Sequence, residues 1–175
     1  MRTAIILAAV LVSASANVHT MASAQTPAHQ HGAASLHVSL EGAVLQIAFE
    51  GPADNLIGFE HAPQNDTEKQ AVARAERQLN QPGQLLATAP AAKCQAEPAR
   101  VEMKLPPPGG GEMHSEIEAE WRWNCAKPAA LTHIDASGLF KAFPRLKELK
   151  VEAVTAQGQK TALLKPGAAR LNIAS

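Results

Sequence analysis

One run of alternating residues decides the fold of this chain: LHVSLEGAVLQIAF, at positions 36–49. Apolar side chains occupy every second position on both sides of Gly42-Ala43, which is the period of a strand with one buried face. A two-residue turn with glycine first is typical of a type II′ hairpin. The register across that turn places three apolar pairs on a single face, namely Leu36–Phe49, Val38–Ile47 and Leu40–Leu45. We therefore predict an antiparallel hairpin whose other face carries polar residues.

The segments that follow the hairpin indicate an α+β fold. A helix is predicted to begin after Asn65, which can cap its first turn together with Glu68, and to stop before Pro82-Gly83. We predict an antiparallel sheet of about six or seven strands, one main helix and a short second helix. The further strands are predicted at 99–105, 116–124, 147–155, 160–164 and 170–173, and the short helix at 138–143.

The N-terminus has the pattern of an export leader. Arg2 precedes an apolar core at 4–12, and Ala22-Ser23-Ala24 fits a cleavage site before Gln25, with an earlier site after Ala16 as the alternative. The apolar run is shorter than the roughly 20 residues that span a bilayer, although an N-terminal anchor is the other interpretation. We expect a signal peptide at 1–24 and a single exported domain at 25–175, in which the Pro/Gly-rich stretch 105–111 is an exposed loop.

The chain contains two cysteines, Cys94 and Cys125. In an oxidising compartment an isolated pair most simply forms a disulfide, so we predict that bond. The alternative is a pair of thiolate metal ligands, which the sequence favours less because no CxxC spacing is present.

Composition argues against several classes of function. The formal net charge is zero and basic runs are lacking, which indicates neither nucleic-acid binding nor insertion into a membrane. Aromatic residues make up only 3% of the chain, so stacking platforms for bases or sugars are not expected. The local motifs of serine hydrolases, zinc proteases and nucleotide-binding enzymes are missing. We therefore expect a protein that is not an enzyme.

Histidines cluster around the open end of the predicted hairpin. His29 and His31 lie just before its first strand, and Glu60 and His61 follow its second strand after Pro52. Imidazole is the commonest protein ligand for transition metals, so these residues are candidate metal ligands. His37 and His114 are candidates for a further ligand or a supporting contact.

Several stretches of the chain resemble the ZrgA family of periplasmic zinc-uptake proteins. The most specific stretch is PADNLIGFEHAP at 52–63, preceded by HQHG at 29–32 and the strand at 36–42. In the second half, CAKPAAL at 125–131 and FKAFPRL at 140–146 are also similar to the family. Many members carry a long His/Asp/Glu-rich central insert, whereas the corresponding stretch here contains no histidine. Loading of many ions by such a loop is therefore not expected.

The resemblance implies a soluble periplasmic protein that binds zinc and helps an inner-membrane system import it. Zinc would be captured as cargo, without chemical conversion, and the protein is expected to be a monomer. The candidate ligands are His29, His31 and His61, with Glu60, His37 and His114 as further ligands or supporting residues. Two alternatives stay open: copper as the cargo, with Met103 and Met113 as soft ligands, or a structural or interaction module that binds no metal.

Overall fold

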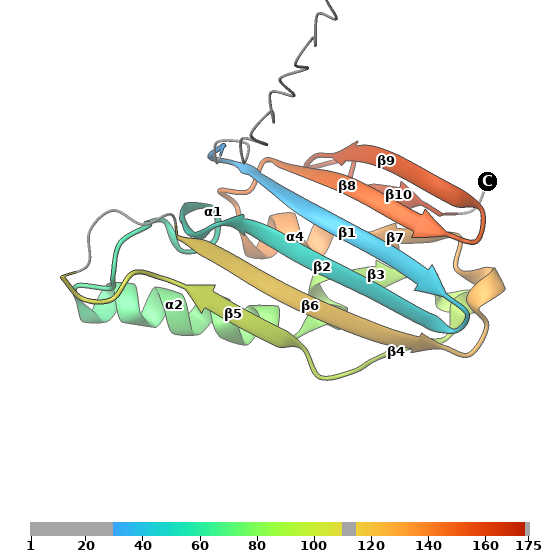
Figure 1. Ribbon diagram of the computed structural model, residues 1–175, viewed down its shortest axis with the longest axis horizontal. Coiled ribbons are helices and arrows are strands. Elements are labelled where there is room, and N and C mark those ends of the chain that lie inside the picture. The colour runs from blue at the N-terminus through green and yellow to red at the C-terminus, as the bar shows by residue number, and fades with distance from the viewer. Residues whose placement is uncertain (1–29, 110–114, 174–175) are drawn as a thin grey trace, which may run out of the picture.

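The computed structural model describes residues 30–109 and 115–173, which form two packed layers (Figure 1). One layer is a seven-stranded sheet in the order β4-β6-β2-β1-β8-β9, with β5 also paired to β6. The helices and a three-stranded sheet in the order β10-β7-β3 form the other layer. This arrangement confirms the predicted α+β class.

The elements have the following bounds. The strands of the large sheet are β1 Ala33–Glu41, β2 Val44–Pro52, β4 Cys94–Ala96, β5 Arg100–Lys104, β6 Glu116–Cys125, β8 Glu148–Thr155 and β9 Gly158–Leu164. The small sheet consists of β3 Ala87–Thr88, β7 His133–Asp135 and β10 Arg170–Asn172. The helices are α1 Ala53–Ile57, α2 Asp66–Leu79, α3 Pro82–Leu85 and α4 Ser137–Ala142, with 3-10 turns at Pro90–Ala92 and Pro128–Ala130.

The β1–β2 hairpin has the predicted register. A type II′ turn requires a positive φ at the first of its two central residues and not at the second. Gly42 has a φ of 57°, and Ala43 does not have a positive φ, so the turn meets this requirement. The three paired apolar positions are those expected, Leu36–Phe49, Val38–Ile47 and Leu40–Leu45. Alternation therefore fixed both the pairing and the buried face of this hairpin.

The large sheet is mixed, because β1 pairs with β8 in parallel. Ala33 lies opposite Glu148 at one end of this pair, and Ser39 lies opposite Val154 at the other. The alternating pattern of 147–155 gives the faces of β8 but not its direction. Between β6 and β8 the chain crosses through the helical layer, and this crossover lets β8 run in the same direction as β1. The remaining strand pairs of the sheet are antiparallel.

Helix α2 is capped as its sequence predicts. The side chain of Asn65 accepts a hydrogen bond from the Glu68 N–H at 3.0 Å, and the Glu68 carboxylate accepts one from the Gln64 N–H at 2.6 Å. At the other end of the helix, the indole N–H of Trp121 donates to the Leu79 carbonyl at 2.8 Å. The capping bonds define where α2 begins, and the Trp121 hydrogen bond fixes its far end against β6.

The predicted disulfide between Cys94 and Cys125 is confirmed, with an S–S distance of 2.06 Å. Cys94 begins the short edge strand β4 and lies directly opposite Cys125 on β6. The bond therefore joins two neighbouring strands.

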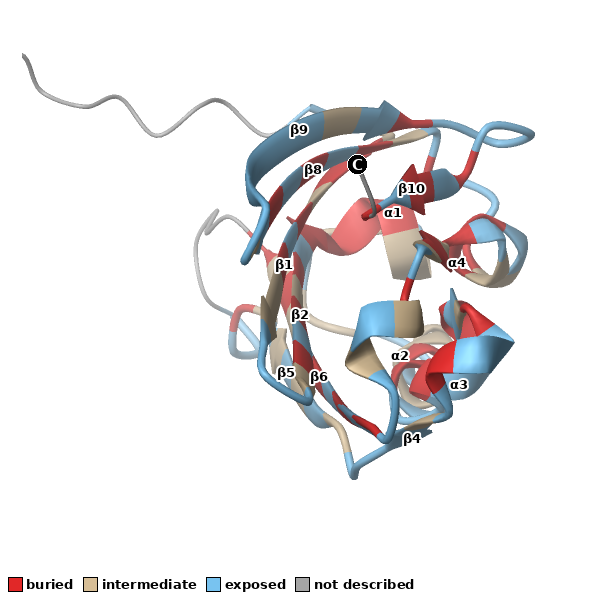
Figure 2. Cartoon of the chain, turned by 90° about the vertical axis from the view of Figure 1, so that its right-hand side faces the viewer, coloured by how far each residue is buried: buried red, intermediate tan, exposed pale blue. Residues whose placement is uncertain are grey.

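In the part of the chain that the structure describes, the helical layer covers one face of the large sheet. Buried and exposed residues alternate along β2 and β6, as the colours of Figure 2 show, so one face of these strands is in the core and the other is open. Trp121 and Trp123, on the apolar face of β6, are 0% and 3% exposed, so they belong to the core. Among the described residues, no helix has the length and apolar character needed to cross a membrane. The predicted signal peptide lies outside the described residues.

Candidate metal centre

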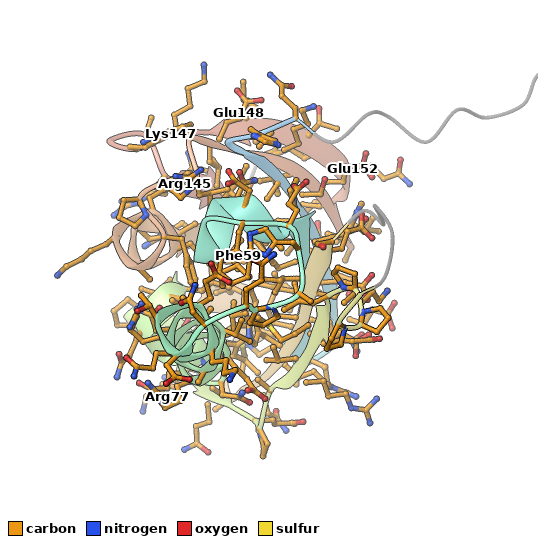
Figure 3. The ribbon with its side chains drawn as sticks, turned by 90° about the vertical axis from the view of Figure 1, so that its left-hand side faces the viewer. Phe59, Arg77, Arg145, Lys147, Glu148 and Glu152 are labelled. Atoms are coloured by element: carbon orange, nitrogen blue, oxygen red, sulfur yellow. A yellow bond between two sulfur atoms is a disulfide. The ribbon has the colours of Figure 1, made fainter. Side chains whose placement is uncertain are left out.

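Three segments of the chain meet at the end of the sheet where β1 begins. They are the residues that lead into β1, the segment 53–60 that contains α1, and the turn between α4 and β8 (Figure 1). Figure 3 looks directly at this end, where Arg145 and Lys147 of the turn lie above Phe59. The hairpin brings the first two segments together, because α1 follows β2 without an intervening loop.

Asn55 fastens the start of β1 to α1. Its side chain is buried, with 1% of the residue exposed. The side-chain oxygen accepts a hydrogen bond from the Gly32 N–H, and the side-chain nitrogen donates to the Ala33 carbonyl at 2.7 Å. The Gly32 carbonyl in turn accepts from the N–H groups of Lys147 and Glu148 at 2.7 and 2.9 Å. The backbone next to His31 is thus fixed by both other segments.

Asp54, the residue before Asn55, forms an ion pair with Arg145. The Arg145 Nη2 atom donates to both carboxylate oxygens of Asp54, at 2.6 and 2.8 Å, and Nε donates to the Asp54 carbonyl at 2.9 Å. This carboxylate raises the pKa of Arg145 above its ordinary value, first through the hydrogen bonds and then through charge attraction. Only 12% of the Asp54 side chain is exposed, so its carboxylate is held in one orientation.

The imidazole of His31 lies between two carboxylates. Its Nδ1 atom is 3.7 Å from an Asp54 oxygen, and its Nε2 atom is 3.8 Å from an Oε1 of Glu60. The Ser115 hydroxyl donates to the Glu60 carbonyl, which fixes the backbone of the loop that carries this carboxylate. The His31 ring itself is 68% exposed, so solvent and ions reach it. The structure therefore brings together two of the predicted ligands, His31 and Glu60.

Comparison with protein families places the chain in a known family. The model of the ZrgA family zinc uptake proteins matches residues 28–173. The chain belongs to the ZrgA family. Proteins of curated function gave no match to the chain. The family match confirms the resemblance derived from the sequence and associates the protein with zinc uptake.

His61, another predicted ligand, lies on the same loop of this ZrgA-family chain as Glu60. Its imidazole contacts other groups than His31 does. Its Nδ1 atom lies 2.9 Å from the Ala62 carbonyl and 3.9 Å from a Glu68 oxygen. Because a carbonyl only accepts, Nδ1 is the protonated nitrogen in that contact, and the lone pair of the neutral ring lies on Nε2. The ring stacks on Phe59, with 4.9 Å between the ring centres.

His37 lies away from this end of the sheet. It occupies the open face of β1, four residues after Ala33, and so lies about 13 Å along the strand. Its Nδ1 atom is 3.5 Å from a Glu152 oxygen on the neighbouring strand β8. Across 30–109 and 115–173, no three His, Cys, Asp or Glu residues are arranged to hold a metal ion. The predicted ligands His29 and His114 lie outside those ranges.

Sequence reasoning missed the residues that support His31. Asp54 and Asn55 belong to the stretch that carries the family resemblance, but nothing local shows that one pairs with Arg145 and the other with Gly32. Arg145 lies 91 positions from Asp54 in the sequence. An aspartate and an asparagine directly after a buried strand were the available signal, because such residues seldom follow a strand into the core without a partner.

Proposed function

We propose that the protein captures zinc in the periplasm at the sheet end around His31 and assists an inner-membrane import system in acquiring it. The observation that carries this proposal is the His31 imidazole, exposed to solvent and placed between the carboxylates of Asp54 and Glu60. Membership of a zinc uptake family supports zinc as the cargo.

The spacing of His31 and Glu60 suits a shared zinc ion. Zinc takes imidazole nitrogen and carboxylate oxygen at about 2.0–2.2 Å, so two ligands of a tetrahedral ion lie about 3.3 Å apart. The Nε2–Oε1 distance of 3.8 Å needs to shorten by only a fraction of an ångström. Glu60 is 35% exposed at its side chain and is able to make that movement. These two residues form the core of the proposed site.

We propose that other predicted ligands complete the zinc site. Tetrahedral zinc requires further donors, and His61 follows Glu60 directly with its Nε2 lone pair available. His29 is two residues before His31, and His114 precedes Ser115, whose hydroxyl binds the Glu60 carbonyl. We propose one or two of these imidazoles as the remaining ligands. His37 is left out of the site because it pairs with Glu152 on the open face.

Capture of this kind requires no chemical step from the protein. The imidazoles bind as neutral rings, and free histidine has a pKa of about 6.5, so protons compete with zinc below that value. We therefore expect zinc affinity to fall between pH 7.5 and pH 5.5.

Calorimetric titration of the exported protein with zinc at both pH values tests the proposal. Replacing His31 by alanine should weaken binding at pH 7.5 by about tenfold or more. His37→Ala, which removes another exposed imidazole that lies on β1 away from this site, should leave binding unchanged. Equal affinity at both pH values would argue against imidazole ligands. A wild-type protein that binds no zinc would support the metal-free module, and tighter binding of Cu(I) in competition would support copper.

The role in import has its own test. In a host that lacks this protein, growth under zinc limitation should be restored by the wild-type chain and by His37→Ala, but not by His31→Ala. Equal restoration by both variants would contradict a role for the His31 site in zinc acquisition.

A further inference from the structure

We infer that the Asp54–Arg145 ion pair decides which nitrogen of His31 takes the metal, directing it to Nε2 and away from Nδ1. The inference rests on the proposed zinc site and adds to it two residues that position the ligand without binding the ion. It follows from the arrangement of charge on the two sides of the imidazole ring.

The two ring nitrogens face carboxylates that differ in their surroundings. Asp54, on the Nδ1 side, accepts three hydrogen bonds from Arg145, two at its carboxylate and one at its carbonyl. Glu60, on the Nε2 side, has no Lys or Arg within ion-pair distance among the residues that the structure describes. A metal ion on the Nδ1 side would therefore lie beside a guanidinium, and one on the Nε2 side would not.

The charge difference favours Nε2 for zinc. Two positive charges a few ångströms apart repel each other by about 1 kcal/mol in water and more where solvent is partly excluded. On the Nε2 side, Glu60 contributes an unneutralised carboxylate to the ion. The charge of Asp54 is already balanced by Arg145, so this carboxylate attracts a metal ion less strongly than Glu60 does.

Asp54 instead serves as a hydrogen-bond acceptor for the metal-bound imidazole. When zinc binds Nε2, the neutral ring carries its proton on Nδ1, and this N–H needs an acceptor. The Asp54 oxygen at 3.7 Å is placed to be that acceptor after a small movement of the exposed ring. A carboxylate behind a metal-bound imidazole orients the ring and increases its basicity. Arg145 holds this carboxylate in place, so both residues are positioning residues.

The backbone around His31 limits how the ring can turn. Asn55 and Gly32 hold the chain on one side, and a Cβ at Gly32 would come within 3.2 Å of the Lys147 side chain. Gly32 has a φ of 85°, a backbone conformation that favours glycine. The backbone next to His31 is therefore fixed, which keeps the ring within reach of both Asp54 and Glu60.

Nitrogen NMR of histidine-labelled protein tests the inference, because the 15N shifts of a ring show which nitrogen carries a proton and which carries a metal. In the wild-type protein with zinc, His31 should show zinc on Nε2 and a proton on Nδ1. In Arg145→Gln, which removes the positive charge and frees Asp54, a second set of signals with zinc on Nδ1 should appear. Arg145→Lys, which keeps the charge, should retain the wild-type pattern.

Two further variants complete the design. Asp54→Asn should weaken zinc binding by about tenfold, the lower end of the effect of losing such a supporting carboxylate. Arg170→Gln removes an arginine from a different ion pair, with Asp135, and should change neither affinity nor pattern. Zinc on Nδ1 in the wild-type protein, or an unchanged pattern in Arg145→Gln together with unchanged affinity in Asp54→Asn, would overturn the inference. A His31 ring that does not respond to zinc in the wild-type protein would instead contradict the proposed site itself.

Discussion

Replacing Asn55 by alanine should destabilise the protein strongly, because this buried side chain satisfies two backbone groups at once. The substitution leaves the Gly32 N–H and the Ala33 carbonyl without their partner. Each unsatisfied buried group costs about 1–3 kcal/mol, so we expect a loss of about 2–4 kcal/mol in the free energy of unfolding. For a chain of this length, that corresponds to a fall of about 5–15 °C in the melting temperature.

Thermal and urea denaturation of the two proteins measures this loss. Asn80→Ala is the matched control, because Asn80 also donates to a carbonyl, that of Glu76, but does so in solvent at the end of α2. The control should change the unfolding free energy by less than about 0.5 kcal/mol. If Asn55→Ala were no more destabilising than Asn80→Ala, the buried amide would not fix the start of β1, and the argument for an ordered His31 would fail.

Three further predictions concern other parts of the fold. Reduction of the Cys94–Cys125 bond, which closes a loop over 31 positions, should lower the unfolding free energy by about 3–4 kcal/mol; identical denaturation curves with and without reductant would contradict this. Hydrogen bonds from the Ser137 side chain and from the Ser137 N–H lower the pKa of Asp135 below its ordinary value, so Asp135→Ala should cost about 1 kcal/mol at pH 7. That difference should be fully present above the unfolded pKa and shrink as pH falls through the folded value, and a gap that persisted at pH 2 would argue against the carboxylate. Gly138→Ala should impair folding, since a Cβ would come within 2.7 Å of the Leu85 carbonyl; wild-type stability in denaturation would contradict this packing of α4 on α3.

Local pattern was enough to predict the hairpin, the main helix and its cap, and most later strands. Each depends on residues close in sequence, such as Gly42 in its turn or Asn65 with Glu68. The parallel pairing of β1 with β8 was not predictable, because alternation determines faces but not direction. Helix α1 was missed because five residues are too few to show a helical period.

The candidate site, like the fold, could be predicted from the sequence only in part. The hairpin register correctly indicated that His31 and Glu60 leave the same end of the sheet. It also placed His37 on the polar face, four residues along the strand from Ala33, which is the reason it stands apart from them. The contacts of Asp54 with Arg145 and of Asn55 with Gly32 depend on how α1 and the α4–β8 turn pack, and no pattern within either segment encodes that packing.

The most direct test of the zinc site is a crystal structure of the zinc-loaded protein, with the metal located by its anomalous scattering. We predict zinc about 2.0–2.1 Å from Nε2 of His31, with a Glu60 oxygen bound to the same ion. Zinc bound between His37 and Glu152, with none at His31, would contradict the account.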